Sequence, residues 1–202
     1  MKIMATSSKK LLDREIRKYD YLFEHNVLYN ANTVHPRYDA AEAFLRRCGK
    51  VKVVGDIGSG RGIFFDRLRA QGYETFALEP STVVVNQRKS PYFIRGTCDD
   101  MPYADSLFDV VFCLDVLEHI PGALISRSLK ELRRVTKRYL ILSVASHEDV
   151  VEKMTLHISI KTYPAWDTLI SKEFKIIDTT MIHSKTYPGR TAKMYLCEKR
   201  RR

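Results

Sequence analysis

An apolar stretch followed by three closely spaced glycines constrains the fold of this chain more than any other feature. Residues 51–57 are rich in β-branched side chains and predict a buried strand. Gly58, Gly60 and Gly62 then follow at every second position, and a helix is expected from about Ile63. Glycine allows positive φ and a close approach of another molecule to the backbone. The stretch therefore predicts a strand, a tight ligand-binding turn and the start of a helix.

An acidic residue, Asp56, lies directly before this turn. The common dinucleotide fingerprint, G-x-G-x-x-G, has its last glycine one residue later than the G-x-G-x-G spacing found here, and it places a pyrophosphate on the helix N-terminus. A carboxylate at this place would repel a pyrophosphate but attract an ammonium or sulfonium group. The turn is therefore expected to bind a cationic nucleotide that carries an amino acid.

Three segments together resemble the motifs of the class I (Rossmann-like) S-adenosylmethionine-dependent methyltransferases. Residues 56–62 resemble the first motif, Glu79 ends the next expected strand, and residues 107–120 resemble the fourth strand and its following loop. The similarity covers Val51 to Ser143 well and the remainder loosely. It implies S-adenosylmethionine as the cofactor and S-adenosylhomocysteine as the product.

The order of the expected elements agrees with this resemblance. Strands and helices alternate over residues 51–145, which predicts a parallel sheet with right-handed crossovers. Two later strands, near 174–183 and 191–198, are expected to form a closing hairpin. The resemblance implies an α/β fold with a seven-stranded, mostly parallel sheet in the order 3-2-1-4-5-7-6, its last strand antiparallel, and helices on both faces. The other expected elements are helices at 8–26, after Pro36, and at 62–71, 81–88, 122–135 and 163–171, and strands at 74–79, 92–96, 108–114 and 138–145.

Composition limits the class of protein and its partners. The chain has 202 residues and a hydrophobic fraction of 45%, which predicts one globular domain over residues 1–202. We expect a helical cover at 1–48, a cofactor-binding half at 49–145 and an acceptor-side half at 146–202. No apolar run is long enough to span a membrane and no secretory signal is evident, so we expect a cytoplasmic location. The net charge of +10 keeps nucleic acid open as a partner, and the oligomeric state is not predicted.

The resemblance also assigns the cofactor contacts. Asp56 is expected to orient the methionine portion within the glycine turn, with capping of the turn as the alternative. Glu79 is expected to accept hydrogen bonds from both ribose hydroxyls, with an exposed strand-end carboxylate as the alternative. The Asp99 carboxylate or the Cys98 backbone is expected to hold the adenine amino group, and Leu114 to pack beside the cofactor or simply in the core. The full expected set is Asp56, Gly58, Ser59, Gly60, Gly62, Glu79, Pro80, Cys98, Asp99, Leu114 and Arg37.

Arg37 enters that set through a further likeness. It resembles an arginine that precedes the first strand in ubiquinone-biosynthesis-type O-methyltransferases, where it pairs with the carboxylate of the cofactor. A guanidinium fits a carboxylate with two parallel hydrogen bonds, so the pairing is chemically sensible. A surface arginine is the alternative interpretation.

Methyl transfer requires mainly that the acceptor be aligned with the sulfonium, and a general base matters when the acceptor is a hydroxyl. The candidate bases are His157, in the acceptor-side half, and His119, after the fourth expected strand, where Asp115 and Glu118 are further candidates. A buried, hydrogen-bonded histidine is the alternative for either imidazole. No zinc cluster or metal-binding carboxylate set stands out in the sequence, so a reaction without a metal ion is expected.

We therefore expect a methyltransferase that moves a methyl group to an oxygen, with nitrogen second, of a small molecule or a glycan. Residues 114–117 replace the Asn/Asp-Pro-Pro-aromatic motif common in amino-directed nucleic-acid methyltransferases, which disfavours methylation of base amino groups. The alternatives are an RNA or protein methyltransferase, argued from the charge, and a partner subunit that binds the cofactor without catalysis. The acceptor pocket is expected around Tyr29 and residues 146–166.

Overall fold

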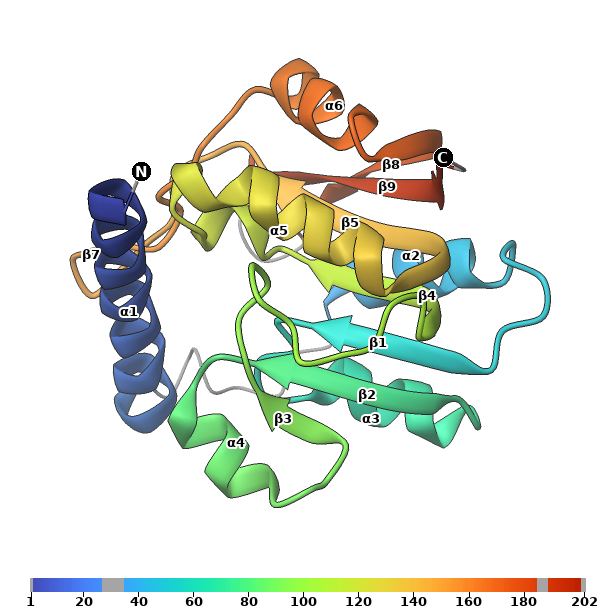
Figure 1. Ribbon diagram of the computed structural model, residues 1–202, viewed down its shortest axis with the longest axis horizontal. Coiled ribbons are helices and arrows are strands. Elements are labelled where there is room, and N and C mark those ends of the chain that lie inside the picture. The colour runs from blue at the N-terminus through green and yellow to red at the C-terminus, as the bar shows by residue number, and fades with distance from the viewer. Residues whose placement is uncertain (1, 27–34, 185–188, 201–202) are drawn as a thin grey trace.

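A single seven-stranded sheet forms the centre of the computed structural model, which describes residues 2–26, 35–184 and 189–200, with side chains from residue 8 onward (Figure 1). The strands follow the order β3-β2-β1-β4-β5-β9-β8. Their bounds are β1 Val53–Ile57, β2 Glu74–Glu79, β3 Phe93–Arg95, β4 Phe108–Leu114, β5 Thr136–Ala145, β8 Phe174–His183 and β9 Thr191–Lys199. The expected segment around Tyr29 lies outside the described residues.

The strand directions confirm the expected mostly parallel sheet. Strand β1 pairs in parallel with β2 and β4, and β4 pairs in parallel with β5. Strand β9 runs antiparallel to both of its neighbours, β5 and β8. A separate hairpin, β6 Val150–Val151 with β7 Met154–Thr155, was not expected, because strands of two residues have no measurable periodicity. With that hairpin set aside, β8 and β9 are the sixth and seventh strands and the order is the expected 3-2-1-4-5-7-6.

Helices cover both faces of the sheet, as expected. Apolar side chains of α2 and α3 pack on one face and those of α5 and α6 on the other. The expected helix ranges after the glycine turn are reproduced within a residue at each end, whereas the first helix begins at Lys2 rather than at residue 8. The bounds are α1 Lys2–His25, α2 Pro36–Leu45, α3 Ile63–Ala70, α4 Thr82–Arg88, α5 Gly122–Val135 and α6 Tyr163–Ser171, with a short 3₁₀ helix, η1, at Leu117–His119.

Strand β4 shows how the core is divided between the two faces. Val110 and Phe112 belong to the apolar cluster under α2 and α3, and Val111 and Cys113 belong to the one under α5 and α6. All four side chains are fully buried, because successive residues of a strand point to opposite faces and both faces are covered. The continuous apolar run in the sequence is thus explained by a central strand.

Helix α1 stands across the edge of the sheet at which β1 and β2 end (Figure 1). Side chains tie it to other segments there: the Lys18 ammonium donates to the Thr155 carbonyl at 2.9 Å, and Ser81 Oγ donates to Asp20 Oδ1 at 2.6 Å. The carboxyl ends of parallel strands are where open α/β sheets bind ligands. Helix α1 therefore covers the edge where the site is expected. Within the described residues, no helix is long and apolar enough to cross a membrane.

Candidate active site

The glycine turn connects the end of β1 to the start of α3 in a conformation that needs glycine. Gly58, Gly60 and Gly62 have φ of +73°, +52° and +79°, a region that other residues rarely adopt. A Cβ atom on Gly58 would lie 2.4 Å from Val116 Cγ2, and one on Gly62 would lie 2.6 Å from Phe93 Cε2. Positive φ and close packing together explain the spacing of the motif.

Asp56 lies at the end of β1 and is only 3% exposed. Burial and the neighbouring Glu79 raise the pKa of its carboxyl to about 7, although Arg37 and a hydrogen bond from the Phe65 backbone oppose this shift. Its Oδ2 atom is buried and has no hydrogen-bond partner in the described part of the chain. A buried carboxylate oxygen without a partner is costly, and a cation or a hydrogen-bond donor in contact with it removes that cost. The geometry therefore fits the ammonium of a bound amino acid.

Glu79, the last residue of β2, is a second buried carboxylate at the same edge. It accepts hydrogen bonds from the Gly60 N–H at 2.8 Å and from the Ser81 N–H at 2.9 Å, and burial raises its pKa to about 7. It is 4% exposed, so it is not the exposed strand-end carboxylate of the alternative interpretation. A carboxylate has about four acceptor positions, so these two bonds leave room for both hydroxyls of a ribose. Pro80 continues the chain, and its carbonyl accepts a bond from Arg95 Nε at 3.3 Å.

These two carboxylates predict a pH dependence of cofactor binding. A cationic ligand needs them ionised, and in the free protein each has a pKa of about 7. We expect affinity for S-adenosylmethionine to rise with pH, by about tenfold for each carboxylate between about pH 6 and pH 8. Calorimetric titration across this range would measure it, with Asp56→Asn as a variant that should lose part of the dependence. Affinity that stays constant or falls as the pH rises would contradict this assignment.

The residues expected near the adenine lie after β3 and at the end of β4. Cys98, Asp99 and Leu114 are all nearly buried, with exposures of 6%, 9% and 8%. The carbonyl of Asp99 accepts a hydrogen bond from Arg127 Nε at 2.7 Å, and its carboxylate lies 3.8 Å from the same nitrogen. Arg127 of α5 thus holds the backbone of this segment. The choice between the Asp99 carboxylate and the Cys98 backbone as the adenine contact stays a prediction.

Arg37 is not a surface arginine, because its side chain is only 26% exposed. It forms an ion pair with Asp115, whose other oxygen accepts a hydrogen bond from Ser143 Oγ. The guanidinium and the hydroxyl keep the pKa of Asp115 below its usual value, so Asp115 is ionised and paired. Arg37 Nε is buried without a partner among the described residues. The expected contact between Arg37 and the cofactor carboxylate stays a prediction. Neither the ion pair of Arg37 with Asp115 nor the hydrogen bond from Ser143 to Asp115 has a signal in the sequence.

The two candidate bases lie side by side. The ring centroids of His119 and His157 are 4.7 Å apart. Nδ1 of His157 lies 2.6 Å from the His147 carbonyl, and Nδ1 of His119 lies 3.1 Å from the Leu156 carbonyl. Burial and His157 lower the pKa of His119 to about 4, so this imidazole is neutral at pH 7 and can accept a proton. Both histidines are hydrogen-bonded, as in the alternative interpretation, and the structure still brings them together at one edge.

Helix α1 adds residues that sequence reasoning did not assign to the site. Tyr19 Oη lies 2.5 Å from Nδ1 of His119, and Arg61 Nη2 donates to the Phe23 carbonyl at 2.6 Å. The spacing of apolar residues predicted an amphipathic helix here, but not which strand ends it would cover. Helix α1 thus lies directly against both the glycine turn and the histidines.

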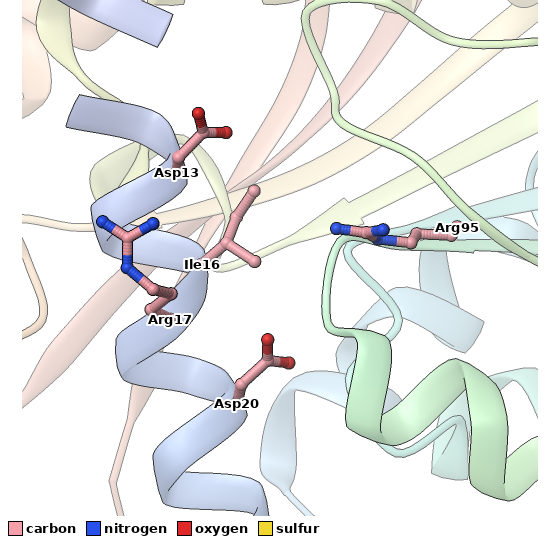
Figure 2. Close-up of a pocket in the computed structure, with 5 residues that line it drawn as sticks. All are labelled: Asp13, Ile16, Arg17, Asp20 and Arg95. Carbon is pink, nitrogen blue, oxygen red and sulfur yellow. The ribbon is translucent and has the colours of Figure 1, made fainter. Parts of the chain in front are cut away.

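A small cavity opens between α1 and the end of β3 (Figure 2). It has a volume of about 170 Å³ and is lined by Asp13, Ile16, Arg17, Asp20 and Arg95. Ligand pockets usually measure about 300–1,000 Å³. This cavity is therefore smaller than a usual ligand pocket, and its lining includes none of the residues expected to bind the cofactor.

Comparison with known proteins relates the chain to methyltransferases. Residues 55–142 match the family model described as a methyltransferase domain. The ubiquinone biosynthesis O-methyltransferase of Rickettsia felis is 25% identical over 107 residues, which cover 48% of this chain and 43% of that protein. The match thus spans less than half the length of this curated relative.

Two solved structures share the fold over almost the whole chain. The Burkholderia thailandensis 1,6-didemethyltoxoflavin-N1-methyltransferase, crystallised with S-adenosylhomocysteine, has a TM-score of 0.77 at 16% identity and covers 96% of this chain and 91% of its own. The magnesium protoporphyrin IX methyltransferase of Synechocystis, solved with S-adenosylmethionine, has a TM-score of 0.67 at 18% identity and covers 92% and 97%. At such identities the likeness to these structures concerns the fold alone. The family match is a separate finding and covers residues 55–142, which include the glycine turn and Glu79. Residues 55–142 therefore match a methyltransferase domain, and the chain shares its fold with these two methyltransferases.

Proposed function

We propose that this protein transfers a methyl group from S-adenosylmethionine to an oxygen of a small molecule or a glycan. The observation that supports this most is the pair of buried carboxylates, Asp56 and Glu79, beside three glycines with positive φ at the carboxyl edge of the sheet. Asp56 carries the unpartnered oxygen that suits an ammonium, and Glu79 has acceptor positions left for the ribose. Oxygen is favoured over nitrogen by the match to a ubiquinone biosynthesis O-methyltransferase.

In this proposal the cofactor supplies an activated methyl group, and the protein aligns it with the acceptor. Such alignment can contribute a large part of the rate enhancement. His119 is neutral at pH 7 because its pKa is lowered to about 4. His119 follows β4 and His157 follows the β6–β7 hairpin, in the part of the chain that we assign to acceptor binding. Either imidazole can receive the proton of an acceptor hydroxyl, directly or through water.

Nucleic acid is the weaker alternative as an acceptor. The expectation of such a partner depends on basic residues in and after α5, namely Lys130, Arg133, Arg134, Lys137 and Arg138. Arg134 is committed to Glu131 and Asp105, and Lys137 lies 3.2 Å from Asp109. These two cations pair with carboxylates of the chain itself and so offer less charge to a phosphate backbone.

Turnover with defined acceptors distinguishes these functions. The protein is incubated with S-adenosylmethionine and, separately, with phenols, sugars, primary amines and RNA, and release of S-adenosylhomocysteine is measured by mass spectrometry. The proposal predicts acceptor-dependent release with a hydroxyl compound that falls by at least about tenfold in a His119→Gln, His157→Gln variant. Release with RNA alone would favour the nucleic-acid alternative. Cofactor binding without turnover on any acceptor would favour a partner subunit without catalysis.

A further inference from the structure

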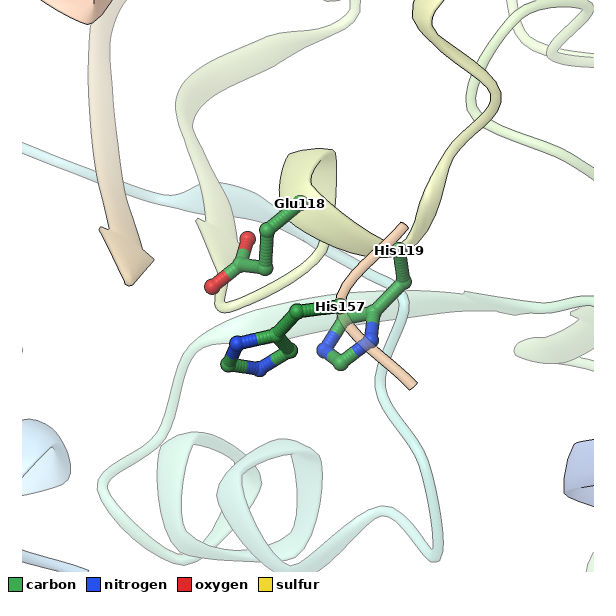
Figure 3. Close-up of side chains that lie close together, drawn as sticks. All are labelled: Glu118, His119 and His157. Atoms are coloured by element: carbon green, nitrogen blue, oxygen red, sulfur yellow. The ribbon is translucent and has the colours of Figure 1, made fainter. Parts of the chain in front are cut away.

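A cluster of three side chains that can bind metal lies where the segment after the β6–β7 hairpin meets η1. Glu118, His119 and His157 each place one potential ligand atom within 4.8 Å of the others. Figure 3 shows the Glu118 carboxylate directed toward the His157 ring, and the His119 ring beside the His157 ring. Glu118 is fully buried and His157 is 6% exposed. We propose that these three side chains form a binding site for a divalent transition-metal ion such as Zn²⁺.

The carboxylate has one oxygen that the protein leaves without a partner. Oε1 of Glu118 accepts a hydrogen bond from the Ala145 N–H at 2.7 Å, which fixes the side chain. Oε2 is buried and has no partner within the described part of the chain. A bound cation would remove both the unsatisfied oxygen and the cost of its charge.

The imidazoles are held in the manner typical of metal ligands. Backbone carbonyls can only accept hydrogen bonds, so the His147 and Leu156 carbonyls favour a proton on Nδ1 of His157 and His119. The Tyr19 hydroxyl, 2.5 Å from Nδ1 of His119, can accept a hydrogen bond from the same N–H. Each Nε2 is then left with a lone pair. Histidines that bind metals almost always donate their other ring N–H to a carbonyl or a carboxylate in this way.

The backbone brings the two halves of the cluster together. The Ile158 and Ser159 N–H groups both donate to the Glu118 carbonyl, at 3.0 and 2.9 Å. Ser159 Oγ donates to the Ile120 carbonyl at 2.6 Å. The segment that carries His157 is therefore fixed against η1, and the cluster does not depend on side-chain contacts alone.

The donor set indicates which ion would bind. Two imidazoles and one carboxylate suit Zn²⁺ and other first-row divalent ions, whereas Mg²⁺ prefers oxygen ligands alone. Zinc bonds of about 2.0–2.2 Å bring tetrahedral ligand atoms to roughly 3.4 Å from one another, so atoms that now lie up to 4.8 Å apart would approach by up to about 1.4 Å. Three protein ligands leave a fourth position for an exogenous oxygen. An ion there would bind an acceptor hydroxyl and make it more acidic, and this would replace proton transfer to either imidazole; the role rests on the proposed function.

The test uses the full chain after removal of metal with a chelator. Titration with Co²⁺ followed by visible absorption, and with Zn²⁺ by calorimetry, should show one equivalent bound, with Zn²⁺ displacing Co²⁺ and Mg²⁺ failing to do so. Glu118→Gln, which retains an acceptor for the Ala145 N–H, and His157→Gln should each weaken Zn²⁺ binding by at least about 100-fold, since loss of outer-shell partners alone costs about 10–100-fold. His25 and His183 are exposed, so His25→Gln, His183→Gln is the matched control and should bind Zn²⁺ as the unmodified chain does.

Three results would overturn the site: no Zn²⁺ bound by protein with a native circular dichroism spectrum, equal affinity in Glu118→Gln, or loss of binding in the control variant. Titration of the same samples with S-adenosylhomocysteine separates this inference from the proposed function. Normal S-adenosylhomocysteine binding without Zn²⁺ binding contradicts the metal site alone and leaves a structural pair of hydrogen-bonded histidines. Zn²⁺ binding without S-adenosylhomocysteine binding counts against the proposed function alone.

Discussion

Replacement of Asp56 by asparagine is expected to stabilise the ligand-free protein and to weaken cofactor binding strongly. The folded protein raises the pKa of Asp56 from 3.8 to about 7 by burial and by the neighbouring Glu79. When folding raises the pKa of a carboxyl, the protein loses stability as the pH rises from the pKa of the unfolded state to that of the folded state. Ionised Asp56 therefore destabilises the folded protein at about pH 8. Asparagine is neutral and nearly the same size, so Asp56→Asn removes the buried charge without leaving a cavity.

The expected gain in the free energy of unfolding is about 2–4 kcal/mol at pH 8, because each unit between the folded and unfolded pKa is worth about 1.4 kcal/mol. The gain should shrink steadily as the pH is lowered toward 4, where the folded carboxyl is protonated and the unfolded one becomes so. Urea unfolding of the two proteins between pH 4 and pH 8 measures it. Affinity for S-adenosylmethionine should fall at least about 100-fold in the same variant, since the neutral amide replaces the negative charge of the carboxylate whose Oδ2 is unpartnered among the described residues. A variant that is less stable at pH 8 and still binds the cofactor normally would contradict both statements.

Replacement of Gly58 by alanine is expected to be strongly destabilising. Gly58 has φ of +73°, and its added Cβ would lie 2.4 Å from Val116 Cγ2. A left-handed backbone costs an ordinary residue about 1–2 kcal/mol, and overpacking adds about 1–3 kcal/mol. We therefore expect Gly58→Ala to lower the free energy of unfolding by about 2–5 kcal/mol and to impair cofactor binding, because the turn and Val116 must shift.

Gly60 provides the matched control for this effect. Its φ is +52°, but the nearest atom to an added Cβ is Phe23 Cζ at 4.0 Å. Gly60→Ala should therefore cost only the backbone contribution of about 1–2 kcal/mol. Adding Val116→Ala to Gly58→Ala should restore part of the lost stability, since it removes the atom that clashes. Equal unfolding free energies for Gly58→Ala and Gly60→Ala, measured in urea, would show that packing against Val116 is unimportant.

The fold was predictable because its signals are local and strong. The β-branched run before Gly58 and the alternation of strands and helices predict a parallel sheet from side-chain periodicity and turn chemistry. The strand order and the antiparallel last strand were implied by the resemblance to the class I methyltransferases. The same reasoning could not find the β6–β7 hairpin, whose strands have two residues each. It also did not predict the short 3₁₀ helix η1 at residues 117–119.

The candidate site was predictable only where its residues belong to a motif. Asp56 lies just before the glycine turn, and Glu79 is the last residue of the next strand. Because β1 and β2 are neighbours in the sheet, both side chains lie at the same edge. The pairing of Arg37 with Asp115 joins residues 78 positions apart, and the contact between Tyr19 and His119 joins residues 100 apart. Such pairs depend on how α1 and α2 dock onto the sheet. Sequence periodicity gives the buried face of a helix but not the partner of each polar side chain.

The most direct test of the central claim is calorimetric titration of the purified protein with S-adenosylhomocysteine, beside an Asp56→Ala, Glu79→Ala variant. The two side chains are only 3% and 4% exposed at the edge of the sheet, so circular dichroism must first show that the variant is folded. The account predicts micromolar binding by the unmodified chain and no detectable binding by the variant. Absence of binding by the well-folded unmodified chain, or equal binding by both proteins, would contradict a cofactor site built on these two carboxylates.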